Sequence, residues 1–151
     1  MTGENDKLLY EAVKMELNMC DLYLLYRDIF SRDSDFWTQL AKEEKGHAAL
    51  LELGREVGDI LPDELLCGKI ADMNRMNMDM GNIIEKFKKE APSVEDACKY
   101  AIEVENSAYE LHYQHLASLG ADSEVIRRFQ KLNGYDKDHA ERIAAFLADK
   151  K

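Results

Sequence analysis

The segment that decides the fold reads Phe36-Trp-Thr-Gln-Leu-Ala-Lys-Glu-Glu-Lys-Gly-His47. Most of its residues favour a helix, and it ends in Glu44-x-x-His47, an acid and a histidine three positions apart. On a helix these two side chains lie on one face, and that face is otherwise apolar. A buried carboxylate and imidazole must be hydrogen-bonded, paired with an opposite charge or bound to a metal, because an unpaired buried charge is too costly.

The composition indicates one acidic domain. A chain of 151 residues is long enough for a sizeable core, and we expect a single domain over residues 1–151. The formal net charge of -10 argues against nucleic acid or an anionic membrane surface as a partner, since both attract patches of lysine and arginine. No apolar run approaches the ~20 residues of a membrane span, and the first residues lack the layout of a signal peptide.

The cysteines favour a reducing, cytoplasmic setting. Cys20, Cys67 and Cys98 are odd in number and widely spaced, which is unlike a disulfide framework. No Cys-x-x-Cys pair occurs, so the sequence excludes a zinc ribbon and a rubredoxin-type iron site. We therefore expect a cytoplasmic protein.

The sequence predicts an all-α fold. Only two prolines occur, and no window alternates apolar and polar residues over the length of a strand. Four long helices are predicted, over residues 5–30, 35–57, 93–119 and 122–149. Ser93 is the expected N-cap of the third, with an acid three residues later. The crossover between the second and third helices, residues 63–90, is predicted to contain one or two helices with Gly81 as a weak point.

An internal repeat relates the two halves of the chain. Ala12-Val-Lys-Met-Glu16 and Ala101-Ile-Glu-Val-Glu105 share an alanine, apolar second and fourth residues, a charged third residue and a final glutamate. Glu44-x-x-His47 begins 28 residues after the first pentad ends, and Asp136-x-x-His139 begins 31 residues after the second. A chain of this composition contains roughly one acid-x-x-His by chance. The evidence for a repeat is therefore the matched spacing of the two motifs from the two pentads, and not the motif itself. The chain is interpreted as two diverged helical hairpins joined by the long crossover.

Six side chains at matched positions form a candidate metal site. In a four-helix bundle with one crossover, they would meet in the core. Buried carboxylates without counter-charge would repel one another or take up protons, whereas two divalent cations would balance four negative charges. Carboxylate oxygen with imidazole nitrogen suits iron, manganese or zinc. The candidate ligands are Glu16, Glu44, His47, Glu105, Asp136 and His139.

This ligand pattern resembles the ferritin-like superfamily, and within it the rubrerythrin-type di-iron bundles, over nearly the whole chain. The resemblance implies a four-helix bundle with one long crossover, two iron ions as cofactors, and reduction of peroxide or dioxygen. By the same resemblance, Glu16 and Glu105 would be terminal ligands on separate irons. The remaining four ligands would be two bridging carboxylates and one histidine for each iron, namely Glu44, Asp136, His47 and His139.

Three features depart from that family's pattern. The fourth carboxylate is Asp136 where the family has glutamate, and a side chain one methylene shorter would bridge less well and loosen the second metal site. Rubrerythrins carry a further glutamate one turn after the third-helix ligand, and this chain has Ala108 there. The family's rubredoxin domain is absent from the sequence, so we expect electrons from an external donor such as a rubredoxin.

Other interpretations remain open at this stage. The same residues would also serve metal binding or iron handling without turnover, and we expect a homodimer because bundles of this type often pair. A third possibility is a non-enzymatic interaction module whose surface is the methionine-rich crossover at Met73, Met76, Met78 and Met80, although methionines at helical spacing are more often core filler. Near the ligands, Cys20, Tyr23, Tyr109 and His112 either orient them or are ordinary core residues.

Overall fold

The protein, studied as a computed structural model, is described over residues 3–57, 70–113 and 124–150. Within these ranges it contains α-helices, one short 3-10 turn and no strand, which confirms the predicted all-α class. The helices are α1 (Gly3–Ile29), α2 (Ser34–Val57), α3 (Ile70–Lys89), α4 (Val94–Tyr113) and α5 (Glu124–Asp149). Inside these helices, side chains are not described at residues 4–5, 54–57, 108–113, 124–126, 128–130 and 132–137.

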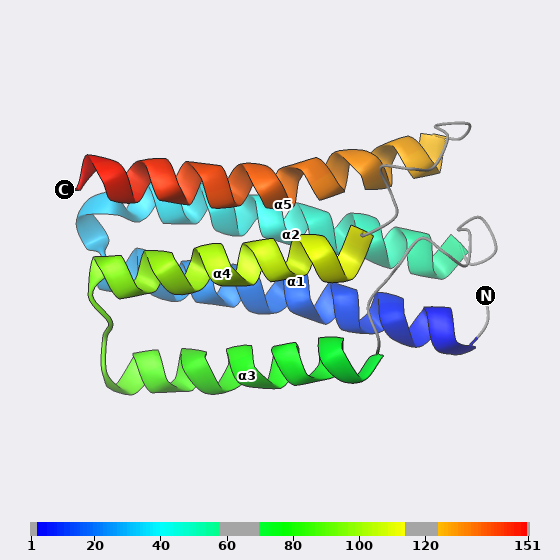
Figure 1. The fold of residues 1–151 in the computed structure, drawn as a ribbon, viewed down its shortest axis with the longest axis horizontal. Coiled ribbons are helices and arrows are strands. Elements are labelled where there is room, and N and C mark those ends of the chain that lie inside the picture. The colour runs from blue at the N-terminus through cyan, green and yellow to red at the C-terminus, as the bar shows by residue number, and fades with distance from the viewer. Residues whose placement is uncertain (1–2, 58–69, 114–123, 151) are drawn as a thin grey trace.

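The helices lie along roughly parallel axes (Figure 1). α1 packs along α2, α4 packs along α5, and α3 lies against α1. Because α3 carries the chain back across the molecule, α2 and α4 run in the same direction. The finer prediction, a ferritin-like bundle, stays a prediction. None of the described helices is both long enough and apolar enough to cross a membrane.

The helices are separated at short polar segments, where the sequence predicts the breaks. A 3-10 turn at Ser31–Asp33 separates α1 from α2, so the chain reverses within a few residues. At the start of α4, the backbone N–H of Asp96 donates a hydrogen bond of 3.1 Å to Ser93 Oγ, which confirms Ser93 as the N-cap. The predicted C-terminal end of the third helix, after residue 113, lies outside the described residues.

Buried polar contacts hold α3 against α1. Asn77, which is 3 % exposed, donates hydrogen bonds to the Glu11 side chain at 2.8 Å and to the Glu11 backbone carbonyl at 3.0 Å. Asn18 donates to the Asn77 side-chain oxygen at 3.0 Å, and Asn74 donates to Glu11 at 3.2 Å. These hydrogen bonds satisfy polar groups that would otherwise destabilise the interface, and they fix the position of α3 along α1.

α3 continues as one helix through Gly81, the residue predicted as a weak point. Met80 and Ile84 on either side are buried, and their packing outweighs the low helix propensity of glycine. The methionine cluster is divided: Met73 and Met80 belong to the core, whereas Met78 is 61 % exposed.

An aromatic cluster fills the core at one end of the molecule. Trp37 of α2 is fully buried, stacks on Tyr23 at a ring-centroid distance of 5.8 Å and meets Tyr26 edge-on at 5.0 Å. Phe36 stacks on Phe146 at 4.3 Å with an angle of 5° between the rings, which joins α2 to α5. Aromatic pairs of this kind add to the free energy of burial, and the cluster sets the distance between helices that carry site residues.

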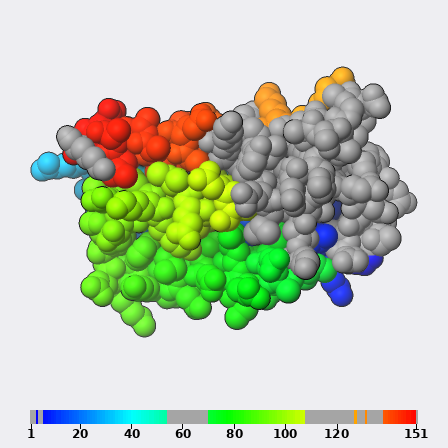
Figure 2. Space-filling view, in the orientation of Figure 1, coloured from blue at the N-terminus to red at the C-terminus, as the bar shows by residue number. Residues whose placement is uncertain are grey.

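α3 and α4 adjoin on the face shown in Figure 2. A hollow between them has both acidic and apolar walls, and α3 contributes a single arginine to it. The lining residues are Asp72, Arg75, Met76, Asp79, Tyr100, Glu103, Val104 and Ser107.

Candidate metal centre

Five of the six predicted ligands are buried together in the core. Glu16 comes from α1, Glu44 and His47 from α2, Glu105 from α4 and His139 from α5. All are 0 % exposed except His47, which is 6 % exposed. The sixth, Asp136, lies one turn before His139 on α5, and its side chain lies outside the described residues.

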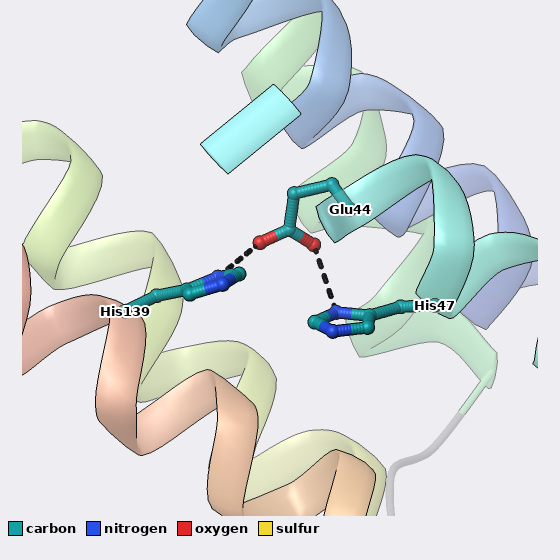
Figure 3. Close-up of side chains that lie close together, drawn as sticks. All are labelled: Glu44, His47 and His139. Atoms are coloured by element: carbon teal, nitrogen blue, oxygen red, sulfur yellow. Dashed lines mark hydrogen bonds and ion pairs between the residues drawn. The ribbon is translucent and has the colours of Figure 1, made fainter. Parts of the chain in front are cut away.

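Glu44 lies between the two imidazoles (Figure 3). Its Oε1 is 2.5 Å from His139 Nδ1, and its Oε2 is 3.5 Å from His47 Nδ1. The two rings face each other with centroids 5.4 Å apart and an angle of 20° between their planes. Donor atoms of these three side chains all lie within 4.8 Å of one another, so one cation could contact them together.

Each imidazole also has a second carboxylate beside it. Glu16 Oε2 is 3.7 Å from His47 Nδ1, and Glu105 Oε1 is 3.2 Å from His139 Nδ1. The cluster therefore consists of two similar halves, each with one imidazole and one carboxylate, on either side of Glu44. This arrangement reproduces the two-fold repeat in the sequence, because each half combines an intrahelical glutamate with the histidine of the following helix.

The carboxylates favour positive charge on both imidazoles. Burial alone lowers the pKa of His47, but the nearby Glu16 and Glu44 carboxylates outweigh burial and raise it to about 10. Burial likewise lowers the pKa of His139, whereas Glu105 and Glu44 raise it to about 11. Without a metal, both imidazoles thus hold their protons at neutral pH and offset part of the buried negative charge.

The donor set fits a transition-metal centre. Three buried carboxylates supply oxygen, two imidazoles supply nitrogen, and iron, manganese and zinc accept this combination. Both histidines direct Nδ1 at the carboxylates, so the same nitrogen of each ring would be the ligand atom. A metal would replace the imidazole protons with a larger positive charge among the same acids.

A tyrosine supports one carboxylate of the centre. The Tyr23 hydroxyl donates a hydrogen bond of 2.5 Å to Glu105 Oε1, between α1 and α4. Burial, and then the Glu105 and Glu44 charges, raise the pKa of Tyr23 well above its usual value, so the phenol keeps its proton. Of the two roles left open for Tyr23, orienting a candidate ligand is the one that this contact supports.

Glu43 and Arg142 are functional candidates that the sequence analysis missed. Glu43 Oε1 lies 3.4 Å from His139 Nε2, the ring nitrogen that faces away from the cluster. Arg142 donates to both Glu43 oxygens, at 2.8 and 3.0 Å, and to Asp138 at 3.2 Å. A carboxylate at Nε2 fixes the orientation of the ring and leaves Nδ1 for the centre. The sequence signal was an acid directly beside Glu44 and an arginine one turn after His139.

Of the remaining candidates near the site, Cys20 is the one whose side chain the structure describes. Cys20 is a buried thiol, and burial together with the Asp21 charge raises its pKa, so it stays protonated. The side chains of Tyr109 and His112 lie outside the described residues, and so does Cys67.

No protein-family model, curated protein or solved structure matches this chain.

Proposed function

We propose that the protein is a two-metal carboxylate redox protein of the ferritin-like, rubrerythrin type, which reduces peroxide or dioxygen with electrons from an external donor. The observation that carries the proposal is the position of Glu44 between His47 and His139, each of which has a further carboxylate beside it. This arrangement is compatible with two adjacent cations that share one carboxylate.

The chain's own residues would hold the metals, orient the ligands and keep water out of the site. Glu16 with His47 would hold one metal, and Glu105 with His139 would hold the other, with Glu44 between them. Asp136 is proposed as the second shared carboxylate, since it lies one turn before His139. Bound ferrous iron would supply two electrons and open coordination positions to the oxidant.

Two groups around the ligands support this chemistry. Tyr23 holds a proton at its hydroxyl, hydrogen-bonded to Glu105 Oε1, and so limits how far that carboxylate can turn. Glu43 keeps the ring of His139 in one orientation through Nε2, while Arg142 holds Glu43. The burial of the cluster keeps bulk water away, which strengthens each electrostatic interaction inside it.

Anaerobic loading with ferrous iron tests the proposal. We expect about two irons bound per chain, as the ligand count requires, and a new near-ultraviolet absorbance after one equivalent of peroxide. Glu105→Ala should lose at least one iron. Glu103→Ala removes an exposed acid two residues earlier on α4 and should bind iron normally. Absence of bound iron in the unmodified protein would refute the metal site.

A metal-binding or iron-handling role without turnover is the alternative at the same site. The ion pairs of Glu44 with His47 and His139 offset buried charge without a metal, so the cluster is compatible with either role. Iron that binds at two per chain but reacts with peroxide no faster than iron in buffer would select this alternative. Size measurement would then separate a shell-forming storage protein from a small oligomer.

The methionine-rich surface receives less support. Met73 and Met80 are buried against the core, which leaves Met78 as the strongly exposed methionine among those described on α3. A cytoplasmic location remains part of the proposal: the described cysteines, Cys20 and Cys98, are free thiols, as a reducing compartment would keep them.

A further inference from the structure

The methionines of α3 occupy three different environments. The buried residues of α3 recur at intervals of four, three and four positions, so they form one face of the helix. They are Met73, Asn77, Met80 and Ile84. Met76 is half-buried beside that face, and Met78 is 61 % exposed. An oxidant dissolved in water therefore reaches these thioethers to very different degrees.

Met78 is the most accessible of these methionines. Hydrogen peroxide oxidises a thioether by transferring one oxygen atom: the O–O bond breaks, the sulfur gives up two electrons and water leaves. The product is a sulfoxide, which is polar where the thioether was apolar. At an exposed position such as Met78 the new oxygen stays hydrated, so its formation costs α3 little stability.

Met76 can also be oxidised without displacing α3. It lines the hollow between α3 and α4, which has a volume of about 350 Å³. A sulfoxide there needs space for one more oxygen atom and a hydrogen-bond donor for that oxygen. The hollow offers both, because Arg75, Tyr100 and Ser107 also line it and carry N–H or O–H groups.

Met73 and Met80 are in the opposite situation. They are 0 % and 1 % exposed and belong to the hydrophobic core. A sulfoxide at either position would bury a polar oxygen among apolar side chains and would weaken the packing of α3 against the bundle. The fold thus shields the two methionines of α3 whose oxidation would be most disruptive.

We propose that Met78 and Met76 are a reversible peroxide-oxidation site, at which α3 takes up oxygen atoms without leaving the bundle. Met78 reacts first because it is the more exposed, and Met76 reacts second. Met73 and Met80 keep their thioethers as long as the protein stays folded. This inference does not depend on the metal centre, because the reaction involves thioether sulfur alone, and it is tested with a chelator present.

Peptide mass spectrometry after treatment with millimolar hydrogen peroxide tests the proposal. Oxygen should be added within α3 at Met78 and then at Met76, while Met73 and Met80 react at least about tenfold more slowly because they require local unfolding. In urea all four should react at similar rates. A methionine sulfoxide reductase with a thiol should remove the added oxygens. Oxidation of Met80 as fast as Met78 in the folded protein would overturn the proposal, as would sulfoxides that resist the reductase.

Leucine variants assign the reaction to its sites. Met78→Leu and Met76→Leu should each remove one added oxygen from α3, and the double variant should remove both. Met19→Leu replaces a fully buried methionine of α1 and should leave the uptake by α3 unchanged. Uptake by α3 that persists in the double variant would refute the assignment.

Glutamine variants test whether position decides the effect of a polar side chain. Met78→Gln should change the melting temperature by less than about 1 °C, whereas Met80→Gln should lower it by at least about 3 °C, because a polar group is then buried without a partner. The oxidised protein, with oxygen at Met78 and Met76 alone, should melt within about 1 °C of the untreated protein. A larger fall, or equal effects of the two glutamine variants, would contradict the proposal.

Discussion

Tyr23 on α1 donates a 2.5 Å hydrogen bond to Glu105 on α4, so a phenol and a buried carboxylate join two helices inside the core. Tyr26, one turn later, is equally buried and donates to a neutral acceptor, the backbone carbonyl of Ala97, at 2.9 Å. The two tyrosines form a natural comparison, because hydrogen bonds to charged groups contribute more to stability than hydrogen bonds to neutral groups.

Tyr23→Phe should therefore cost more stability than Tyr26→Phe. We expect a loss of about 2 kcal/mol in the free energy of unfolding for the first and about 1 kcal/mol for the second. Urea unfolding of the two variants in the presence of a chelator measures both. Equal losses would show that the Glu105 contact has no special weight in the metal-free protein.

Glu43→Gln should weaken metal binding without removing a ligand. The neutral amide attracts the His139 Nε2 proton and Arg142 less strongly than the carboxylate does, so the ring is held less firmly. Loss of a carboxylate behind a ligating histidine typically lowers metal affinity about 10–100-fold. Competition with a chromophoric chelator would measure it, with Glu141→Gln, an exposed acid on α5, as the control. Equal affinities for both variants would remove Glu43 from the site.

The metal-free protein should lose stability as the pH rises. The neighbouring carboxylates raise the folded-state pKa of His47 to about 10 and of His139 to about 11, from an ordinary value of 6.5, despite their burial. Their contribution is therefore complete below about pH 6.5 and is lost as the pH approaches 10 and 11. Melting temperatures with chelator between pH 6.5 and 9.5 should fall steadily, and His47→Gln should fall less steeply. A flat profile for the unmodified protein would contradict this electrostatic description.

Metal binding at neutral pH should release about two protons per chain. Both imidazoles are protonated in the metal-free protein, and a histidine must give up its proton before that nitrogen can bind a metal. Calorimetric titration in two buffers of different ionisation enthalpy gives the number directly. His47→Ala should reduce it to about one. Binding with no proton release would mean that the metal sits among carboxylates alone.

The parts of the structure that depend on the local pattern of residues could be predicted from the sequence. The helices and the N-cap at Ser93 follow from the spacing of residues along one segment. The matched pentads went further: they indicated that Glu16 and Glu105 belong to one cluster, although they stand 89 positions apart.

Contacts between segments without such a repeat were not predictable. The hydrogen bond from Asn77 to Glu11 depends on how α3 lies against α1, and a lone asparagine inside a methionine-rich helix gives no sign of its acceptor. Glu43 was overlooked because an acid beside a candidate ligand usually points to solvent, and only the position of α5 turns it toward His139. The continuation of α3 through Gly81 was not predictable for the same reason, since the buried neighbours of Gly81 determine the helix there.

The stacking of Trp37 on Tyr23 has a practical consequence. Trp37 is the single tryptophan of the chain, so all indole emission comes from one known place. Trp37 stacks directly on Tyr23, and Tyr23 donates a hydrogen bond to Glu105. The protein therefore carries its own fluorescent probe beside the cluster, and an open-shell metal bound there should quench it, so occupancy can be followed in unlabelled protein at nanomolar to micromolar concentration.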